Sequence, residues 1–217
     1  MIVTIDLVLF TIHEGKVKVL LQRRDKAPYQ GQLALEGGYV HEDEDDTTLD
    51  TVHRVFREKL KKEPVYVEQY RSWSSKDADP RGWRISDVYY SVVPLSYLTP
   101  MPPNSELIAI EEVPDNLPMQ HSDIIKGAYA RLKSIIKYSS LPVYFFDKPF
   151  TLYALHKTYE LFKGEEINKV SFRRFIAELD VLEATGEKDR SRACAPADLY
   201  RLKPQYRETI TRLDKSI

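Results

Sequence analysis

The chain has 217 residues and a formal net charge of −1, a balance that favours neither nucleic acid nor an acidic partner for the molecule as a whole. Its 42% apolar and 30% charged residues are typical of a globular protein and exclude a disordered class. The single cysteine excludes an internal disulfide, and no apolar run is long enough to cross a bilayer. We therefore expect a cytoplasmic protein with no membrane partner.

The first part of the chain predicts a β-hairpin followed by a basic segment. Residues 2–12 are rich in β-branched and aromatic side chains, as in a buried strand, and residues 17–22 alternate into a second strand. Arg23, Arg24 and Lys26 follow, and residues 32–35 predict a short strand before a glycine pair. A basic group at this place is suited to neutralising phosphates, although solvated surface charge explains it equally well.

An amphipathic helix is predicted after the acidic loop at residues 42–46. Leu49, Val52, Phe56 and Leu60 recur at helical spacing, so this stripe is expected to face a core. Strands are then predicted at residues 65–73, 84–94 and 107–112, and a second helix at 120–138. This alternation indicates an α+β protein in which a mixed sheet is flanked by two helices.

A change in composition at residues 139–142 indicates a boundary, so residues 1–140 and 141–217 are expected to form two domains. The second domain begins with a helix at 152–162, which Thr151 caps and Gly164 ends. Asn168 is a good cap for a second helix, whose expected buried stripe is Phe172, Phe175, Ile176 and Leu179. A strand at 181–184, a basic turn at 186–192 and a returning strand at 198–202 complete the order of a winged helix-turn-helix.

The most informative stretch is L-E-G-G-Y-V-H-E-D-E-D-D-T-T-L-D-T-V-H-R-V-F-R-E-K-L-K-K, residues 35–62. It resembles a Nudix box, the Mg²⁺- and diphosphate-binding motif of Nudix hydrolases, with the pattern G-x5-E-x7-R-E-U-x-E-E-x-G-U, in which U is aliphatic. Without a gap, Glu44 falls on the first acid and no helical glutamate is matched. With two extra residues in the acidic loop, Arg54, Phe56 and Glu58 match together, and we prefer this register.

In the preferred register Val55 and Lys59 replace two of the three glutamates that would hold the metal. Positions 55, 58 and 59 are expected on one face of the helix, where three carboxylates would bind a hard cation through oxygen. One carboxylate remains there, beside an ammonium that repels a divalent ion. We therefore expect no metal, no cofactor and no hydrolysis. A further departure is Glu36, which stands where the Nudix family usually has proline.

Taken over residues 2–203, the chain resembles Nudix-related transcriptional regulators of the NrtR family. The matching stretches include V-T-I-D-L-V-L-F, D-P-R-G-W-R-I-S-D-V-Y-Y, L-P-M-Q-H-S-D-I-I, F-T-L-Y-A-L-H-K-T-Y-E and L-E-A-T-G-E-K. The resemblance implies a Nudix-like α/β/α sandwich followed by a winged helix, and a homodimer that binds palindromic duplex DNA. Many members of the family sense ADP-ribose and control NAD biosynthesis.

Two sets of site residues are expected from these patterns. The candidates for binding a phosphorylated sugar or nucleotide are Arg23, Arg24, Gly37, Gly38, Arg54, Glu58 and Arg81. The candidates for binding DNA lie on the second helix of the helix-turn-helix and in the basic turn, and are Lys169, Ser171, Arg173, Arg174, Lys188, Arg190 and Arg192. A lone basic helix face is more often solvated surface; its place in this motif favours DNA.

Two other functions are compatible with the sequence. An active Nudix hydrolase of ADP-ribose or a related nucleoside diphosphate derivative is favoured by the glycine pair, Arg54 and Glu58, and opposed by Val55 and Lys59. A protein-interaction module would use the same helix pair without DNA. Metal-dependent turnover would identify the first alternative, and failure to bind duplex DNA the second.

Overall fold

The computed structural model describes residues 1–76, 79–190, 195–207 and 209–217. The chain divides into two compact units, Met1–Ala130 and Arg131–Ile217. The division falls within helix α2 (His121–Ile136), earlier than the boundary expected after residue 140. Within the described ranges, no helix has the length and apolar character needed to cross a membrane.

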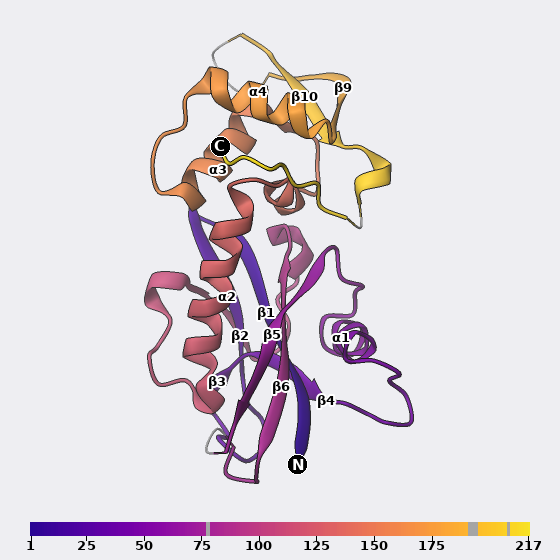
Figure 1. The fold of residues 1–217 in the computed structure, drawn as a ribbon, viewed down its shortest axis with the longest axis vertical. Coiled ribbons are helices and arrows are strands. Elements are labelled where there is room, and N and C mark those ends of the chain that lie inside the picture. Colours follow the sequence, from indigo (N-terminus) through magenta and orange to yellow (C-terminus); the bar gives the residue numbers. More distant parts are fainter. Residues whose placement is uncertain (77–78, 191–194, 208) are drawn as a thin grey trace. The chain divides into compact units, whose positions relative to one another are not determined.

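The first unit is built on one mixed sheet. Its strands are β1 (Ile2–His13), β2 (Lys16–Arg23), β3 (Leu33–Ala34), β4 (Glu36–Tyr39), β5 (Val67–Ser75), β6 (Arg84–Val92) and β7 (Ser105–Ala109). The strands β3, β2, β1, β6 and β5 lie side by side in that order, while β4 pairs with β1 and β7 with β2 (Figure 1). The pair β1–β6 is parallel and the other pairs are antiparallel, so the predicted mixed sheet is confirmed.

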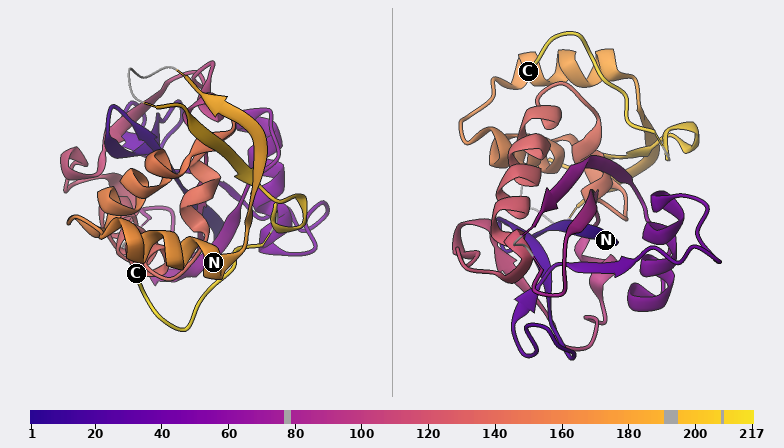
Figure 2. Two further views of the ribbon diagram at one scale, coloured as in Figure 1. Left: turned by 90° about the horizontal axis from the view of Figure 1, so that it is seen from above. Right: turned by 60° about the horizontal axis from the view of Figure 1, so that its bottom comes forward.

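Helices cover both faces of this sheet. The side chains of β1 alternate between the two faces, and apolar residues on both faces pack against helices. Leu7 and Leu9 pack in one buried cluster with Phe56, on the side of α1 (Thr48–Val55). Phe10 faces the other way, and its ring lies 6.1 Å from that of Tyr129 in α2. The two helices lie on opposite sides of the sheet in Figures 1 and 2.

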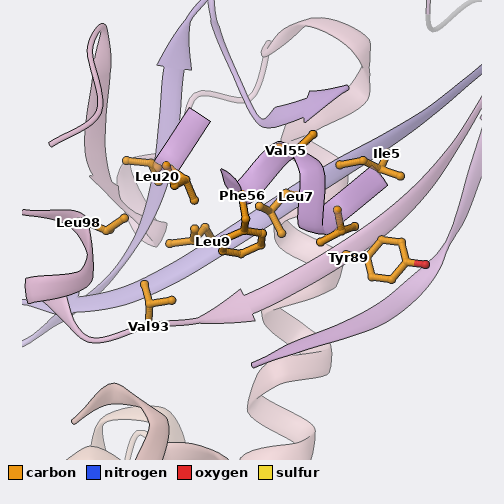
Figure 3. Close-up of a cluster of buried hydrophobic side chains, with 11 residues drawn as sticks. Ile5, Leu7, Leu9, Leu20, Val55, Phe56, Tyr89, Val93 and Leu98 are labelled. Carbon is orange, nitrogen blue, oxygen red and sulfur yellow. The ribbon is translucent and has the colours of Figure 1, made fainter. Parts of the chain in front are cut away.

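The helix of the Nudix-like box differs from its prediction in which residues it buries. Val52, Phe56 and Leu60 are buried as expected, but Leu49 is 41% exposed and Val55 is buried instead. The first turn presents Thr48 to the sheet, where its hydroxyl bonds Asp87 (3.0 Å) and Tyr89 (2.8 Å) of β6. Leu49 is therefore rotated toward solvent. Figure 3 shows Val55 and Phe56 beside the side chains of β1.

The same helix ends in a π-helical turn, Phe56–Leu60, closed by the bond from the Lys61 N–H to the Phe56 carbonyl. Lys61 occupies the place of the glycine in the box pattern and has a left-handed φ of 56°. Lys61 thus adopts a left-handed conformation that glycine would adopt at less steric cost.

The second unit contains the helix-turn-helix and hairpin in the predicted order. Its elements are β8 (Phe150–Thr151), α3 (Leu152–Lys163), α4 (Lys169–Leu179), β9 (Leu182–Asp189) and β10 (Ala197–Leu202). Thr151 caps α3 by accepting from Ala154 N at 3.1 Å, and Gly164 ends it with a φ of 77°. All four predicted core residues of α4 are buried. The α+β fold class predicted from the sequence is confirmed.

The hairpin differs from its prediction in length. The antiparallel strands β9 and β10 join β8 in the order β8–β10–β9, and Figure 2 shows the hairpin continuing from α4. The expected strand at 181–184 extends to Asp189, so Gly186 and Lys188 lie in a strand rather than a turn. Gly186 has a φ of 81°, which glycine adopts without the steric cost of a side chain.

We predict that Phe56→Ala lowers the free energy of unfolding of the first unit by about 3–5 kcal/mol, because it opens a cavity beneath the sheet. Leu49→Ala, on the same helix, should cost less, about 1 kcal/mol, because that side chain is partly exposed and its removal opens no enclosed cavity. Both tryptophans, Trp73 and Trp83, belong to this unit, so tryptophan fluorescence during denaturant unfolding reports on it. Equal losses for the two variants would contradict the packing described here.

Candidate functional site

A pocket of about 610 Å³ lies in the first unit. Six of the seven predicted ligand-binding residues line it: Arg23, Arg24, Gly37, Gly38, Glu58 and Arg81. The remaining basic lining residues are Lys26, Lys59, Lys61 and Arg84. Basic side chains outnumber the acidic ones, which are Asp6, Asp25, Glu36 and Glu58. This surplus of positive charge favours an anionic ligand.

The glycine pair, Gly37 and Gly38, lies in strand β4 and so belongs to the sheet. Gly37 pairs with Asp6, and Gly38 with Ile5, in the antiparallel ladder to β1. A Cβ at Gly37 would lie 2.4 Å from the Ile5 carbonyl oxygen, and one at Gly38 would lie 3.0 Å from Val55 Cγ2. The two glycines therefore allow β4 to lie close to β1 and to the box helix.

One wall of the pocket is a buried polar cluster centred on Asp6 of β1. Its carboxylate accepts hydrogen bonds from the Arg84 guanidinium and from Ser86 Oγ (2.7 Å), both on β6. Its other oxygen lies 3.4 Å from His121 Nε2 at the start of α2. Burial alone would raise the pKa of Asp6, but His121 and Arg84 outweigh it and lower the pKa to about 2.

The geometry around His121 also fixes its tautomer. The Leu35 N–H donates to Nδ1 at 3.0 Å, so the ring proton of the neutral form is on Nε2, facing Asp6. His121 thus links the segment just before β4 to the buried carboxylate. His121 is packed into this cluster, with an exposure of 1%.

Arg54, predicted to bind the ligand, lies elsewhere and is buried. Its guanidinium donates from Nε to Asp45 Oδ1 (3.0 Å) and from Nη2 to Asp45 Oδ2 (2.6 Å), and also to the Tyr39 carbonyl (2.7 Å). These bonds from Arg54 hold the pKa of the Asp45 carboxyl far below its usual range. The Thr51 hydroxyl also donates to Asp45 Oδ2 at 2.9 Å. Arg54 and Thr51, both on the box helix, therefore hold the acidic loop to that helix through Asp45.

The box does not present a set of ligands for a divalent cation. Val55 is buried against β4, Glu58 lies 3.6 Å from Arg54, and the Lys59 ammonium lies 3.1 Å from Glu36. Across the described parts of the chain, no three His, Cys, Asp or Glu side chains are grouped to hold a metal ion. The donors present do not fit the Mg²⁺ site of a Nudix hydrolase, which requires several oxygen ligands.

The three arginines predicted to contact phosphate are all held by neighbouring groups. Arg23 donates to Glu106 (2.7 Å) and Arg24 to the Pro28 carbonyl (2.8 Å). Arg81 binds Asp79 in a bidentate pair and covers the ring of Tyr39 at 5.4 Å. Ligand binding through these residues therefore requires the exchange of existing hydrogen bonds, or the use of guanidinium N–H groups that those bonds leave over.

The second candidate surface is the exposed face of α4. Asn168 caps the helix by accepting from Val170 N (2.9 Å) and Ser171 N (3.1 Å). Phe172 anchors the helix to α3, where its ring lies 4.6 Å from His156 and 5.6 Å from Tyr159. The residues left exposed along the helix are Lys169, Val170, Ser171, Arg173, Arg174, Ala177 and Glu178. All four predicted DNA-binding residues of α4 thus lie at the surface.

In the hairpin, Lys188 lies within β9, where its ammonium is 3.5 Å from Asp198 of β10, and Arg190 follows the strand, also exposed. Arg192 lies outside the described residues. The sequence did not single out Val170, which is 68% exposed beside the basic residues. The sequence did carry a sign of this exposed side chain, because Val170 is apolar but lies outside the predicted buried stripe of α4.

In the pocket, Asp6, Glu36, Arg84 and His121 were not predicted as lining residues. Asp6 carried a signal, since it interrupts an otherwise apolar strand, and a buried charge requires a partner. That partner, Arg84, lies 78 residues away in the chain and could not be identified locally.

These features define the class of protein: a Nudix-like unit with a basic pocket, followed by a winged helix. A family model described as the NrtR DNA-binding winged helix domain matches residues 142–202. The ADPR-responsive transcriptional repressor NtrR of Acinetobacter baylyi is 30% identical over 204 residues, which cover 92% of this chain and 81% of the relative.

Solved structures are similar to this chain, one of them over its whole length. The crystal structure of Shewanella oneidensis NrtR with a 27mer DNA has a TM-score of 0.89 and 31% identity, with full coverage of both chains. The Nudix domain of the same Shewanella protein with ADP-ribose has a TM-score of 0.53 and 28% identity, over 61% of this chain and 88% of that one. The chain belongs to the NrtR family of Nudix-related transcriptional regulators.

The buried cluster makes a prediction about pH. Because the pKa of Asp6 is lowered from 3.8 to about 2, its ionised form stabilises the fold above the ordinary pKa, and this contribution is lost as pH falls toward 2. Asp6→Asn should cost about 3–5 kcal/mol at neutral pH, since Arg84 is left buried without its partner, and should reduce the pH dependence in this acid range. Denaturant unfolding between neutral pH and pH 2 measures both effects.

Asp115→Asn is the matched control, because Asp115 is an exposed carboxylate paired with Lys126. It should leave unfolding nearly unchanged at neutral pH. A neutral-pH stability of Asp6→Asn equal to that of this control would show that the buried cluster is dispensable.

Proposed function

We propose that this chain is a DNA-binding transcriptional regulator whose operator affinity is set by a phosphorylated ligand such as ADP-ribose. The observation that carries the proposal is the pairing of a capped helix with exposed arginines, in a winged helix, with a basic pocket in a Nudix-like unit. The relatives support it: one binds a 27mer DNA, and its Nudix domain binds ADP-ribose.

Recognition of DNA follows from the chemistry of α4. A guanidinium at position 173 or 174 can bond the O6 and N7 of guanine together, a contact worth about 1–3 kcal/mol of discrimination. Val170 is suited to apolar contact with a thymine methyl group. Lys188 and Arg190 in the hairpin are suited to phosphates, which position the protein without reading sequence. A homodimer would place two such helices on the halves of a palindrome.

In the Nudix-like unit we propose ligand binding without hydrolysis. The box retains Glu58 as the single acid of the expected trio, while Val55 is buried and Lys59 is positively charged. An active Nudix hydrolase would need oxygen ligands at these positions to bind Mg²⁺ and activate water. Differential affinity of the ligand for DNA-bound and free forms would then change operator occupancy.

The DNA proposal is tested with duplexes from the chain's own promoter region and from neighbouring operons, each against a scrambled duplex, by fluorescence anisotropy at several salt concentrations. Arg173→Ala/Arg174→Ala should lose most of the preference for the operator. Lys188→Ala/Arg190→Ala should lower the affinity for both duplexes alike. It should also reduce the slope of the logarithm of the binding constant against the logarithm of the salt concentration by about 2. If the helix variant keeps the operator preference of the wild type, α4 is not the recognition helix.

The ligand proposal is tested by thermal shift and product analysis with ADP-ribose. At 100 times its dissociation constant, ADP-ribose should stabilise the chain by about 2.7 kcal/mol and change its affinity for the operator. Incubation with Mg²⁺ or Mn²⁺ should release no AMP above the level of a protein-free blank. Metal-dependent release of AMP and ribose phosphate at ordinary enzymatic turnover would instead establish the hydrolase.

A further inference from the structure

Two residues of the pocket depart from the Nudix pattern, and they contact each other. Glu36 stands where the Nudix family usually has proline, and Lys59 stands in place of the last glutamate of the box. In the structure Lys59 Nζ lies 3.1 Å from Glu36 Oε2. The two departures therefore compensate each other, because the buried carboxylate at position 36 has the ammonium at position 59 as its counterion.

The pair fixes a cation in the pocket. The Glu36 side chain is 3% exposed, and burial raises its pKa while Lys59 opposes that rise. Lys59 also donates to the Gly37 carbonyl at 2.7 Å, so both of these contacts come from the start of β4. The Lys59 side chain is 33% exposed and lines the pocket. An ammonium has three N–H donors, and the hydrogen bond to the Gly37 carbonyl, with Glu36 as the counterion, leaves at least one for a ligand.

We propose that the Lys59 ammonium, held by Glu36 and Gly37, takes the place of the divalent cation and binds the diphosphate of the ligand directly. This inference rests on the proposed function, since it concerns the same pocket. A lysine is a suitable phosphate-binding group because it presents a compact, fixed charge. Ligand binding is therefore independent of Mg²⁺, in contrast to a Nudix hydrolase, in which the metal bridges the carboxylates and the diphosphate.

The alternative role for Lys59 is to neutralise Glu36 and nothing more. A matched pair of full-length variants separates the two roles: Glu36→Gln, which keeps the ammonium, and Glu36→Gln/Lys59→Met, which removes it. Neither variant contains the buried carboxylate, so the double variant is not left with an unpaired buried charge. Lys126→Met, at an exposed ion pair outside the pocket, is the control for loss of a surface charge.

The measurement is isothermal titration with ADP-ribose, and with inorganic pyrophosphate as the minimal probe, in EDTA and in MgCl₂. Wild type should bind ADP-ribose equally in both buffers. The double variant should bind about ten- to a hundredfold more weakly than Glu36→Gln, which corresponds to the loss of one charge-assisted hydrogen bond. Lys126→Met should bind as wild type does.

The failures of this inference and of the proposed function are distinguishable. If wild type binds ADP-ribose only with MgCl₂, or if the double variant binds as well as Glu36→Gln, the role of Lys59 is overturned while the sensor function stands. If wild type binds neither probe in either buffer, both the ligand proposal and this inference fail. Circular dichroism of each variant verifies that weaker binding does not come from unfolding.

Discussion

The Asp6 carboxylate is enclosed in the first unit, where the Arg84 guanidinium neutralises its charge, Ser86 donates a hydrogen bond to it and His121 Nε2 lies 3.4 Å away. An isolated buried carboxylate would be too costly to keep ionised, so these partners must stay in place for β1 to remain in the sheet. They come from β6 and from the start of α2, and His121 also receives the Leu35 N–H. One charged group thereby positions the strand, the helix start and the entry to β4.

This cluster divides the basic residues of the pocket into two kinds. Arg84 is committed to Asp6 and is 4% exposed, so its charge serves the fold. Lys26, Lys59, Lys61 and the arginines nearer the surface supply the remaining positive charge of the pocket, which we propose attracts the anionic ligand. Arg54 is a second example, within the box. It matches the arginine of the motif, but its guanidinium binds Asp45 and so holds the acidic loop in place. Retention of a motif residue therefore does not by itself indicate a contact with ligand.

The sequence was sufficient where the deciding interactions are local. The cap at Asn168, the glycine that ends α3 and the stripe Phe172, Phe175, Ile176 and Leu179 all act within a few residues, and all were predicted correctly. The pocket was predicted only in part, because the partners of Asp6 lie on distant elements. The box helix was partly wrong for a geometric reason. Its first turn presents Thr48 to the sheet through hydrogen bonds to Asp87 and Tyr89 of a distant strand, so Leu49 is exposed rather than buried.

The hairpin was misjudged for a related reason. Charged and glycine residues at 186–189 were interpreted as a turn, whereas β10 pairs with Lys188 and Asp189 and extends the strand. Strand length is decided by the partner strand, which local composition does not specify. The predicted DNA-binding residues are all basic or polar and do not include the exposed Val170, although apolar side chains also contact bases.

The ion pair between Glu36 and Lys59 constrains which residues these two positions can hold. A glutamate at position 59 would bring a second carboxylate near that of Glu36 in place of its counterion, and neighbouring like charges repel. A change at position 36 alone would remove the counterion of a partly buried ammonium. A substitution at either position alone should therefore cost stability, so the two positions are coupled and change without that cost only when they change together.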